Sequence, residues 1–448
     1  MPDLSMREDK PATPTTEKKS RRRFVGSKKA QSPTASIQSE QQEQPAGTIA
    51  TKTRKPRKLT HRILHQIPES ILKDEELNNA IKLLPSNYNF EIHKTVWNIR
   101  KQKAKRVALQ MPEGLLIYSL VIADILEQFC DCEILVMGDV SYGACCIDDY
   151  SARALDCDFI VHYAHSCLVP VDITLIKVLY VFVTINIDEE HLVKTIRRNF
   201  KSGDRIAMFG TIQFNPAIHS IKYKLENPTV GGESKDENDK KLIYVIPPQT
   251  MPLSKGEVLG CTSVRLDPGQ FDAMVYIGDG RFHLESAMIH NPKIPAFRYD
   301  PYSRKITKEG YDHKELVKVR QEAVDVAKKS KKVGLVLGAL GRQGNPLTLQ
   351  NLEQKLVESG RTVVKIILSE IFPGKLAKFD DVDCFVQVAC PRLSIDWGYA
   401  FNKPLLTPYE TMVMLEQDRQ FTEDYYPMDY YYKEGYGRGK VPNHQNVQ

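Results

Sequence analysis

Short apolar runs, each opened by a charged residue, recur three times between residues 100 and 390. The first strand predicted in each copy spans 106–111, 205–210 and 332–338. A later strand in each copy begins at an Asp and ends at a small residue, over 158–164, 272–278 and 383–389. The middle copy is longer because it holds a polar insertion at 226–241, which is typical of a surface loop. One pattern in three copies indicates an internal repeat.

Helical patterns alternate with these strands, and further apolar strands are predicted at 133–137 and 363–368. This alternation predicts parallel βαβ units with right-handed crossovers. We therefore predict an α/β fold of three repeated small domains, each of about 100 residues, with parallel sheets flanked by helices. The predicted segments are a tail at 1–60, lead-in helices and the first repeat at 61–200, the second repeat at 201–310, the third at 311–430 and a C-terminal tail at 431–448. Ligands bind beyond the carboxyl ends of parallel strands, so three such ends around a centre predict a shared site.

The first 60 residues differ from the rest in composition. They hold 14 Lys and Arg against 6 Asp and Glu, so this segment carries the positive charge of a chain whose net charge is +6. With almost no large apolar residues it cannot bury enough surface to fold, and we predict a disordered basic tail. Its basic clusters at 18–23 and 54–58 fit a solvated tail, weak contact with RNA, or an import receptor.

Bulk composition places the chain among globular proteins of the cytoplasm. Apolar residues make up 42% and charged residues 26%, which is ordinary for a folded protein. No apolar run reaches the length of about 20 residues that crosses a bilayer, and the polar N-terminus lacks the apolar core of a secretory signal. We therefore predict a cytoplasmic protein without a membrane partner, in which the nine cysteines do not form a disulfide framework.

One cysteine in each copy falls in a loop that we expect to face the shared site. Cys145 lies in a loop rich in small residues that follows a strand, Cys261 lies in the comparable loop of the second copy, and Cys390 ends a strand of the third. Three thiolates are able to bind zinc or an iron–sulfur cluster, and the absence of CxxC pairs counts against a structural zinc site. A [4Fe–4S] cluster normally has four cysteines, so three leave one iron open to a substrate. Cys146 adjoins Cys145, and we choose Cys145 as the ligand. The other cysteines are interpreted as core residues, with a metal role left open for Cys167.

Several longer segments resemble the diphthamide biosynthesis protein 1 family. They are 142–149 (YGACCIDD), 156–170 (DCDFIVHYAHSCLVP), 298–302 (RYDPY), 341–345 (GRQGN), 108–115 (ALQMPEGL) and 89–94 (NFEIHK). The resemblance covers roughly residues 80–430. It implies a triplicated α/β fold whose cluster cysteines correspond to Cys145, Cys261 and Cys390.

The resemblance also implies an activity and its partners. The expected enzyme is a 3-amino-3-carboxypropyl transferase, which uses a [4Fe–4S] cluster and radical chemistry to move that group from S-adenosylmethionine to a histidine of elongation factor 2. The CxxxCxxC loop of conventional radical enzymes is absent from the sequence. The implied partners are a related second subunit (diphthamide biosynthesis protein 2), a small zinc protein that donates electrons, and elongation factor 2 itself.

Glycine–arginine loops after predicted strands supply candidates for holding S-adenosylmethionine. An arginine binds a carboxylate through two parallel hydrogen bonds, and such loops also occur as simple turns. The candidates are Arg281, Gly341, Arg342, Gln343 and Glu113, with Arg392 as a further one. His162 and His165 are interpreted as interior histidines, or as residues behind the ligands.

Two other functions stay open at this point. A quinolinate-synthase-like lyase also has three α/β domains with one cluster cysteine each, and its open iron polarises a dicarboxylate. A non-catalytic scaffold subunit with an RNA-contacting tail would show salt-dependent binding of nucleic acid that is lost with residues 1–60. The long matching segments favour the transferase.

Overall fold

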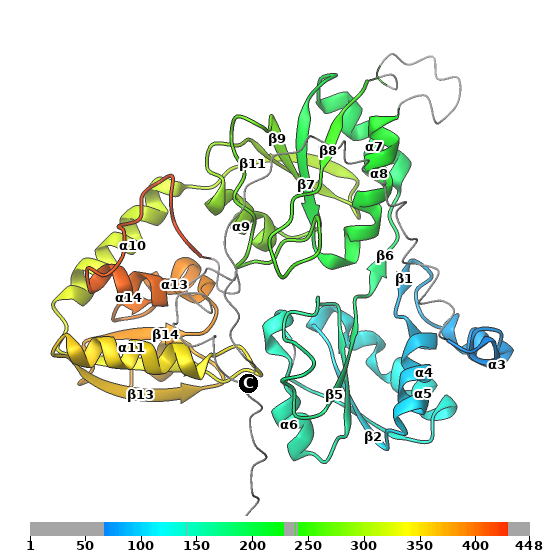
Figure 1. Ribbon diagram of the computed structural model, residues 1–448, viewed down its shortest axis with the longest axis horizontal. Coiled ribbons are helices and arrows are strands. Elements are labelled where there is room, and N and C mark those ends of the chain that lie inside the picture. Colours follow the sequence, from blue (N-terminus) through cyan, green and yellow to red (C-terminus); the bar gives the residue numbers. More distant parts are fainter. Residues whose placement is uncertain (1–66, 140, 228–237, 239–240, 429–448) are drawn as a thin grey trace, which may run out of the picture. The chain divides into compact units, whose positions relative to one another are not determined.

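The computed structural model describes residues 67–139, 141–227, 238 and 241–428 (Figure 1). The predicted tails at 1–60 and 431–448, and most of the insertion at 226–241, lie outside these residues. Within them the fold is α/β, with several parallel sheets flanked by helices, as the sequence predicts. None of the helices in the described residues is both long and apolar enough to cross a bilayer.

The first large sheet is built by residues 106–181 and is preceded by lead-in helices. Its strands run in the order β3-β2-β4-β5, and every neighbouring pair is parallel. The elements are α2 (Glu69–Leu72), α3 (Glu75–Ile81), β1 (Tyr88–Asn89), α4 (Ile92–Gln102), β2 (Arg106–Gln110), η1 (Glu113–Tyr118), α5 (Ser119–Phe129), β3 (Glu133–Val136), η2 (Ala144–Cys146), α6 (Asp149–Ala154), β4 (Phe159–Tyr163) and β5 (Lys177–Val181).

The second large sheet is built by residues 205–309 and has the order β8-β7-β9-β10-β11. Only β11, at its edge, is antiparallel to its neighbour. The elements are β6 (Thr184–Ile185), α7 (Glu189–Asn199), β7 (Arg205–Gly210), η3 (Ile212–Phe214), α8 (Asn215–Glu226), β8 (Tyr244–Ile246), β9 (Ala273–Ile277), α9 (Phe282–His290), β10 (Ala296–Asp300) and β11 (Lys305–Glu309). The short strands β1 and β6 pair with each other.

The third large sheet is built by residues 332–406 and is entirely parallel, in the order β13-β12-β14-β15. The elements are α10 (His313–Lys328), β12 (Lys332–Gly338), α11 (Pro346–Glu358), β13 (Thr362–Leu368), α12 (Pro373–Leu376), β14 (Cys384–Val388), α13 (Arg392–Trp397), η5 (Gly398–Ala400), β15 (Leu405–Leu406) and α14 (Pro408–Met414). The predicted domain boundaries themselves stay predictions.

All three sheets share one strand order, in which the second strand flanks the first on one side and the third and fourth follow on the other. The order reverses between the first and third strands, and ligands bind at the carboxyl ends of strands on either side of such a reversal. The loops after β3, β8 and β14 therefore belong to the ends where a site is expected.

The Asp that recurs in the sequence ties the first and third strands of each repeat together. The Asp383 carboxylate accepts hydrogen bonds from the backbone N–H groups of Lys331 and Lys332 (2.7 and 2.8 Å), and the Asp383 N–H donates to the Lys332 carbonyl (2.9 Å). The corresponding pairs are Asp158 with Arg106 and Asp272 with Arg205. Each Asp thus aligns the amino ends of two neighbouring parallel strands.

Several helices begin at a polar side chain that accepts a hydrogen bond from a backbone N–H group two or three residues ahead. The capping residues are Asp148 for α6, Asp188 for α7, Asp312 for α10, Asn345 for α11 and Thr407 for α14. At α14 the capping is reciprocal, because Glu410 also accepts from the Thr407 N–H.

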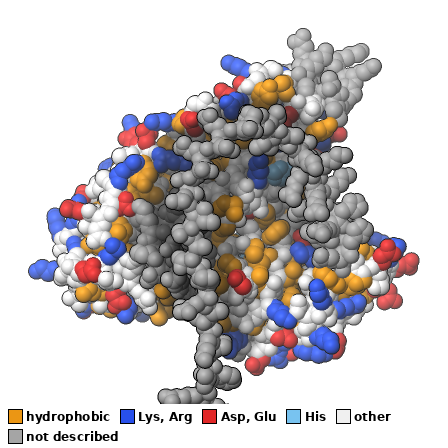
Figure 2. Space-filling view, in the orientation of Figure 1, with side chains coloured by type: hydrophobic (Ala, Val, Ile, Leu, Met, Phe, Trp, Pro, Cys, Tyr) orange, Lys and Arg blue, Asp and Glu red, His pale blue; other side chains and the backbone are white. Residues whose placement is uncertain are grey.

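Apolar side chains fill both faces of each sheet, as expected for parallel sheets covered by helices. The core on one face of the third sheet also includes Ala144 and Leu168 of the first repeat and Leu253 and Ile289 of the second. The repeats therefore share buried surface close to the predicted cysteine loops. On the face seen in Figure 2, charged side chains of both signs are interspersed.

Candidate functional site

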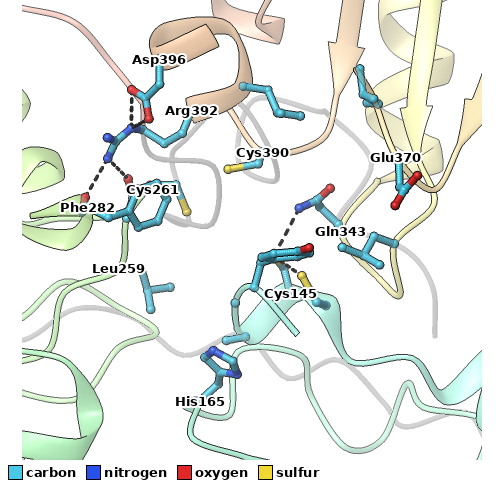
Figure 3. A pocket seen from close by; sticks show the side chains of 18 of the residues that line it. Cys145, His165, Leu259, Cys261, Phe282, Gln343, Glu370, Cys390, Arg392 and Asp396 are labelled. Atoms are coloured by element: carbon cyan, nitrogen blue, oxygen red, sulfur yellow. Dashed lines mark hydrogen bonds and ion pairs between the residues drawn. The ribbon is translucent and has the colours of Figure 1, made fainter. Parts of the chain in front are cut away.

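A cavity of about 790 Å³ lies where loops of all three repeats meet (Figure 3). The first repeat contributes residues of the loop after β3 together with His165, and the second contributes residues around Cys261 and Phe282. The third contributes Gln343, Cys390 and the first residues of α13. Cys145, Cys261 and Cys390 all line this cavity. The structure thus brings together the three cysteines that the repeat pattern selects.

Cys145 and Cys146 occupy one tight turn, η2, but differ in exposure. The Cys146 side chain is fully buried, whereas Cys145 is only partly buried, and their Sγ atoms are 3.8 Å apart. The hydrogen bond with the neighbouring Cys145 thiol, and then burial, raise the pKa of Cys146 far above its ordinary value. The amide of Gln343 lies 4.0 Å from the Cys145 Sγ. Both cysteines line the cavity, and Cys145, the more exposed of the two, stays the predicted ligand.

The other two cysteines are held by local backbone structure. Leu259 and Thr262 bond to each other through both backbone pairs (2.9 and 3.3 Å), which closes a turn around Cys261. Cys390 lies two residues before the start of α13, and its carbonyl accepts a hydrogen bond from the Gln387 amide (3.0 Å). Burial, and then the neighbouring Cys145, raises the pKa of Cys390 to about 12. The thiols of Cys145 and Cys390 are therefore close enough to interact electrostatically.

Arg392, on α13, joins the second and third repeats beside the cavity. Its guanidinium bonds to the Asp396 carboxylate (2.8 Å), to the carboxylate of Glu285 and to the carbonyls of Gly260 (3.2 Å) and Phe282 (2.7 Å). It also lies over the Phe282 ring, 4.4 Å from the ring centre. These contacts use all three guanidinium nitrogens of Arg392. Arg392 therefore holds the Cys261 turn in place, and it is not the free arginine that a ligand carboxylate requires.

Arg342 and Gly341 join the first and third repeats on the other side of the Cys145 turn. Arg342 forms a two-pronged ion pair with the buried Asp149 and lies 4.5 Å from the centre of the Tyr150 ring. Gly341 has φ of +53°, and a Cβ there would lie 2.4 Å from the Cys146 carbonyl oxygen. Neither residue lines the cavity. The expectation that Arg342 faces a ligand carboxylate is not supported, because Asp149 already occupies its guanidinium.

Three candidates for holding S-adenosylmethionine remain, namely Arg281, Gln343 and Glu113. Of these three, only Gln343 lines the cavity. Arg281 is half exposed, donates to the Gly310 carbonyl (3.0 Å) and pairs loosely with Glu309 (3.5 Å). Glu113 is exposed at the first residue of η1, outside the cavity lining. A sequence motif indicates that an arginine follows a strand, but not which carboxylate of the same chain lies opposite it.

Several polar residues in the cavity are not candidates in the sequence. Asp139, Glu370 and Asp396 are acidic, and His283 stacks on Tyr276 with ring centres 6.5 Å apart. Burial lowers the pKa of His283 to about 4 and also lowers the pKa of His165 to about 4. The spacing of Arg392 and Asp396, one helical turn apart, is a usable signal for Asp396. The others become visible only when distant loops are brought together.

The arrangement offers soft thiol donors from three separate loops around a half-buried space. Among the described residues, no three His, Cys, Asp or Glu side chains are grouped as the ligands of a single metal ion. A multi-iron cluster requires a different geometry, because each cysteine binds a different iron.

The sequence matches known proteins over most of its length. Residues 111–427 match the family described as "Putative diphthamide synthesis protein". This chain belongs to that family. The diphthamide synthesis family match contains Cys145, Cys261 and Cys390.

Relatives in this family are similar to the chain from end to end. The "2-(3-amino-3-carboxypropyl)histidine synthase subunit 1" of Kluyveromyces lactis is 71% identical over 96% of this chain and 98% of its own length. The protein of the same name from Saccharomyces cerevisiae is 66% identical, again over 96% and 98%. A solved structure, "Dph2 from Pyrococcus horikoshii with 4Fe-4S cluster", is 24% identical with a TM-score of 0.60 and covers 75% of this chain and 93% of that one. At this identity the likeness shows the fold.

Proposed function

We propose that this chain is the cluster-bearing catalytic subunit of the first step of diphthamide synthesis. In that step the 3-amino-3-carboxypropyl group of S-adenosylmethionine moves to a histidine of elongation factor 2. The observation that carries the proposal is the meeting of Cys145, Cys261 and Cys390, one from each repeat, in a single cavity. The names of the relatives, which are synthases of 2-(3-amino-3-carboxypropyl)histidine, support the same product.

The donor set fits a [4Fe–4S] cluster held by three cysteines. Thiolates are the ligands that iron–sulfur clusters prefer, and the three thiols come from loops that Arg392 and Arg342 hold in place. Cys145, Cys261 and Cys390 would hold three irons and would leave the fourth open to a substrate. The solved Pyrococcus horikoshii structure with the same fold is described as containing a 4Fe-4S cluster. When bound and reduced, such a cluster supplies the electron that cleaves a carbon–sulfur bond of S-adenosylmethionine.

The protein side chains in the cavity suit the charges of that substrate. S-adenosylmethionine carries a positive sulfonium and a positive ammonium group, and Asp139 and Glu370 provide negative charge on the cavity wall, whereas the charge of Asp396 is balanced by Arg392. The Gln343 amide provides a hydrogen-bond donor for the substrate carboxylate near Cys145. Apolar side chains such as Leu259 and Ile371 limit the access of water. These residues bind and orient the substrate beside the thiols.

The proposed reaction requires other proteins. The relatives are named as subunit 1, and we propose that a related second subunit completes the complex. We further propose a small zinc protein as the electron donor and elongation factor 2 as the acceptor of the transferred group. A large protein acceptor must insert only its histidine, because the cavity is of the size of a small-molecule site.

Anaerobic purification of the chain with its partner tests the proposal. We expect four irons and four sulfides, a reducible cluster by EPR, and loss of both in Cys145→Ala, Cys261→Ala and Cys390→Ala. Cys157→Ala is the matched control, because Cys157 lies in the core of the first sheet away from the cavity. Release of methylthioadenosine from S-adenosylmethionine then separates the transferase from a quinolinate-synthase-like lyase. If the iron content is the same in the three variants as in wild type, the catalytic proposal is wrong and the chain is a scaffold subunit.

A further inference from the structure

A chain of hydrogen bonds runs from the Cys145–Cys146 turn to a histidine in the cavity. The Gln110 side-chain amide bonds to the Cys146 carbonyl (2.8 Å), and its oxygen lies 2.8 Å from Nδ1 of His162. His162 Nε2 lies 3.2 Å from Nδ1 of His165. Gln110 and His162 are directly paired residues of β2 and β4. His165 lines the cavity (Figure 3).

Two backbone groups determine which way the Gln110 amide points. The Cys146 carbonyl accepts only, so the Gln110 nitrogen must face it. The Asp148 N–H donates only, and it lies 3.2 Å from the Gln110 oxygen. The reverse orientation would place oxygen against oxygen and N–H against N–H. The Gln110 oxygen is therefore the acceptor that faces His162.

This orientation determines the tautomer of both imidazoles in turn. His162 must donate from Nδ1 to the Gln110 oxygen, so its Nε2 carries a lone pair. His165 must then donate from Nδ1 to that lone pair. The remaining ring nitrogen of His165, Nε2, is left without a proton and is directed away from His162. The protein thereby keeps an unprotonated imidazole nitrogen on the cavity wall.

Burial keeps this arrangement uncharged. His162 is fully buried, and burial, followed by the influence of His165, lowers its pKa well below the ordinary value. Burial, followed by the influence of His283, lowers the pKa of His165 to about 4. At neutral pH both rings are therefore neutral, in agreement with the tautomers that the hydrogen bonds require.

We propose that Nε2 of His165 accepts the proton that leaves the acceptor histidine during group transfer. This inference rests on the proposed function. In the net reaction, the carbon–sulfur bond of S-adenosylmethionine breaks with its electron pair left on the sulfur of methylthioadenosine. A carbon–carbon bond forms at carbon 2 of the acceptor imidazole, and the hydrogen of that carbon leaves as a proton. The electron supplied by the reductant is returned, so the transfer consumes no oxidant.

A weakly basic nitrogen is sufficient for this step. Bond formation at carbon 2 interrupts the aromaticity of the acceptor ring, and loss of the proton restores it, so the carbon–hydrogen bond is strongly acidic at that stage. His162 and Gln110 act as positioning residues, because they set the tautomer and do not touch the substrate. General acid–base catalysis of this kind contributes about 100-fold or more to a rate.

The test compares cleavage with transfer in the reconstituted complex. His165→Asn keeps a donor near the Nδ1 position but removes the cavity nitrogen, and His165→Gln places a non-basic amide there. We expect both variants to keep the cluster spectrum and to release methylthioadenosine within about twofold of wild type, while transfer to elongation factor 2 falls about 100-fold. His219→Asn, on the exposed face of α8, should leave both rates unchanged.

An isotope measurement distinguishes proton acceptance from a structural role. When the target histidine carries deuterium at carbon 2, the His165 variants should show a larger isotope effect on transfer than wild type, because removal of that hydrogen becomes slow. Normal transfer in either variant, or an unchanged isotope effect, would overturn the inference. Equal loss of cleavage and transfer would overturn it as well, since it would assign His165 to substrate or cluster binding. A wild-type complex without cleavage would instead contradict the proposed function.

Discussion

Arg342 and Asp149, which are 193 residues apart in the chain, form a two-pronged ion pair with two N–O distances of 2.7 Å. The Asp149 side chain is fully buried, and it also accepts a hydrogen bond from the Leu175 N–H (2.6 Å). The backbone N–H of Arg342 donates to the backbone carbonyl of Ile147 (3.1 Å). The pair thus fixes the loop that carries Cys145 against the third repeat, next to the cavity but outside it.

Removal of the Asp149 charge should destabilise the fold in a pH-dependent manner. Burial acts to raise the pKa of Asp149, but the Arg342 bonds outweigh it and the pKa is lowered. A lowered folded-state pKa stabilises the protein above the ordinary Asp pKa, and this contribution is lost as the pH falls through the folded-state value. Asp149→Asn should cost about 3 kcal/mol at pH 7. Urea unfolding from pH 7 to pH 3 should show the difference from wild type shrinking, and a difference that is constant with pH would contradict the assignment.

Gly341→Ala should displace the Cys145 turn. The positive φ of Gly341 costs an L-residue about 1–2 kcal/mol, and its new Cβ would meet the carbonyl oxygens of Cys146 and Ile147 at 2.4 and 2.5 Å. We expect a lower melting temperature and loss of bound iron. Gly280→Ala is the control, because a Cβ there meets nothing within 4 Å. Normal iron content in Gly341→Ala would show that the turn tolerates the shift.

The adjacent cysteines should behave differently when each is replaced. Cys145→Ala should lose iron, whereas Cys146→Ala should keep it, because the Cys146 side chain is fully buried and its carbonyl bond to Gln110 survives the change. Loss of the buried thiol should cost about 1 kcal/mol of stability. Iron and sulfide analysis of the two variants decides the matter, and the opposite result would assign the ligand to Cys146.

Glu410→Gln should destabilise the third repeat strongly. Glu410 and Arg320 are both almost fully buried and form two bonds of 2.6 and 2.8 Å, while Tyr426 also donates to Glu410 (2.7 Å). Loss of one partner of a buried pair costs about 3–5 kcal/mol, measured as a lower urea midpoint. Glu315, on helix α10 together with Arg320, forms an exposed ion pair with Lys318. Glu315→Gln should therefore change the free energy of unfolding by less than about 0.5 kcal/mol. Similar midpoints for the two variants would contradict this view.

The repeated strands are predictable from sequence because burial on both faces makes each a continuous apolar run. The predicted strand at 332–338 is β12 residue for residue, and the predicted strand at 205–210 is β7. The recurrent Asp is also visible, and its physical role is a backbone contact between neighbouring strands of one repeat. The apolar strands and the Asp are both features of a single repeat. Because the chain contains three repeats, each of these features can be recognised three times in one sequence.

The pairing of charged side chains across repeats is not predictable in this way. Arg342 and Arg392 follow strands as the sequence indicates, but the carboxylates that they bind across repeats, Asp149 and Glu285, are not evident from their local sequence. An arginine that serves structure and one that binds a ligand have the same local sequence. The same limit applies to His165, whose spacing from His162 is plain but whose tautomer depends on Gln110 in a neighbouring strand.

The distribution of the cavity over three sheets also has a consequence for biosynthesis. Cys145 and Cys261 leave the ribosome while the strands of the third sheet are still unmade, and Cys390 follows β14 near the end of the chain. Arg392, which binds the carbonyls of Gly260 and Phe282, emerges after Cys390. A nascent chain therefore has no complete set of three thiols and no contact that holds the Cys261 turn. Insertion of the proposed cluster, which uses all three thiols, must therefore wait for the synthesis of the third repeat, and the first two thiols depend on a reducing environment until then.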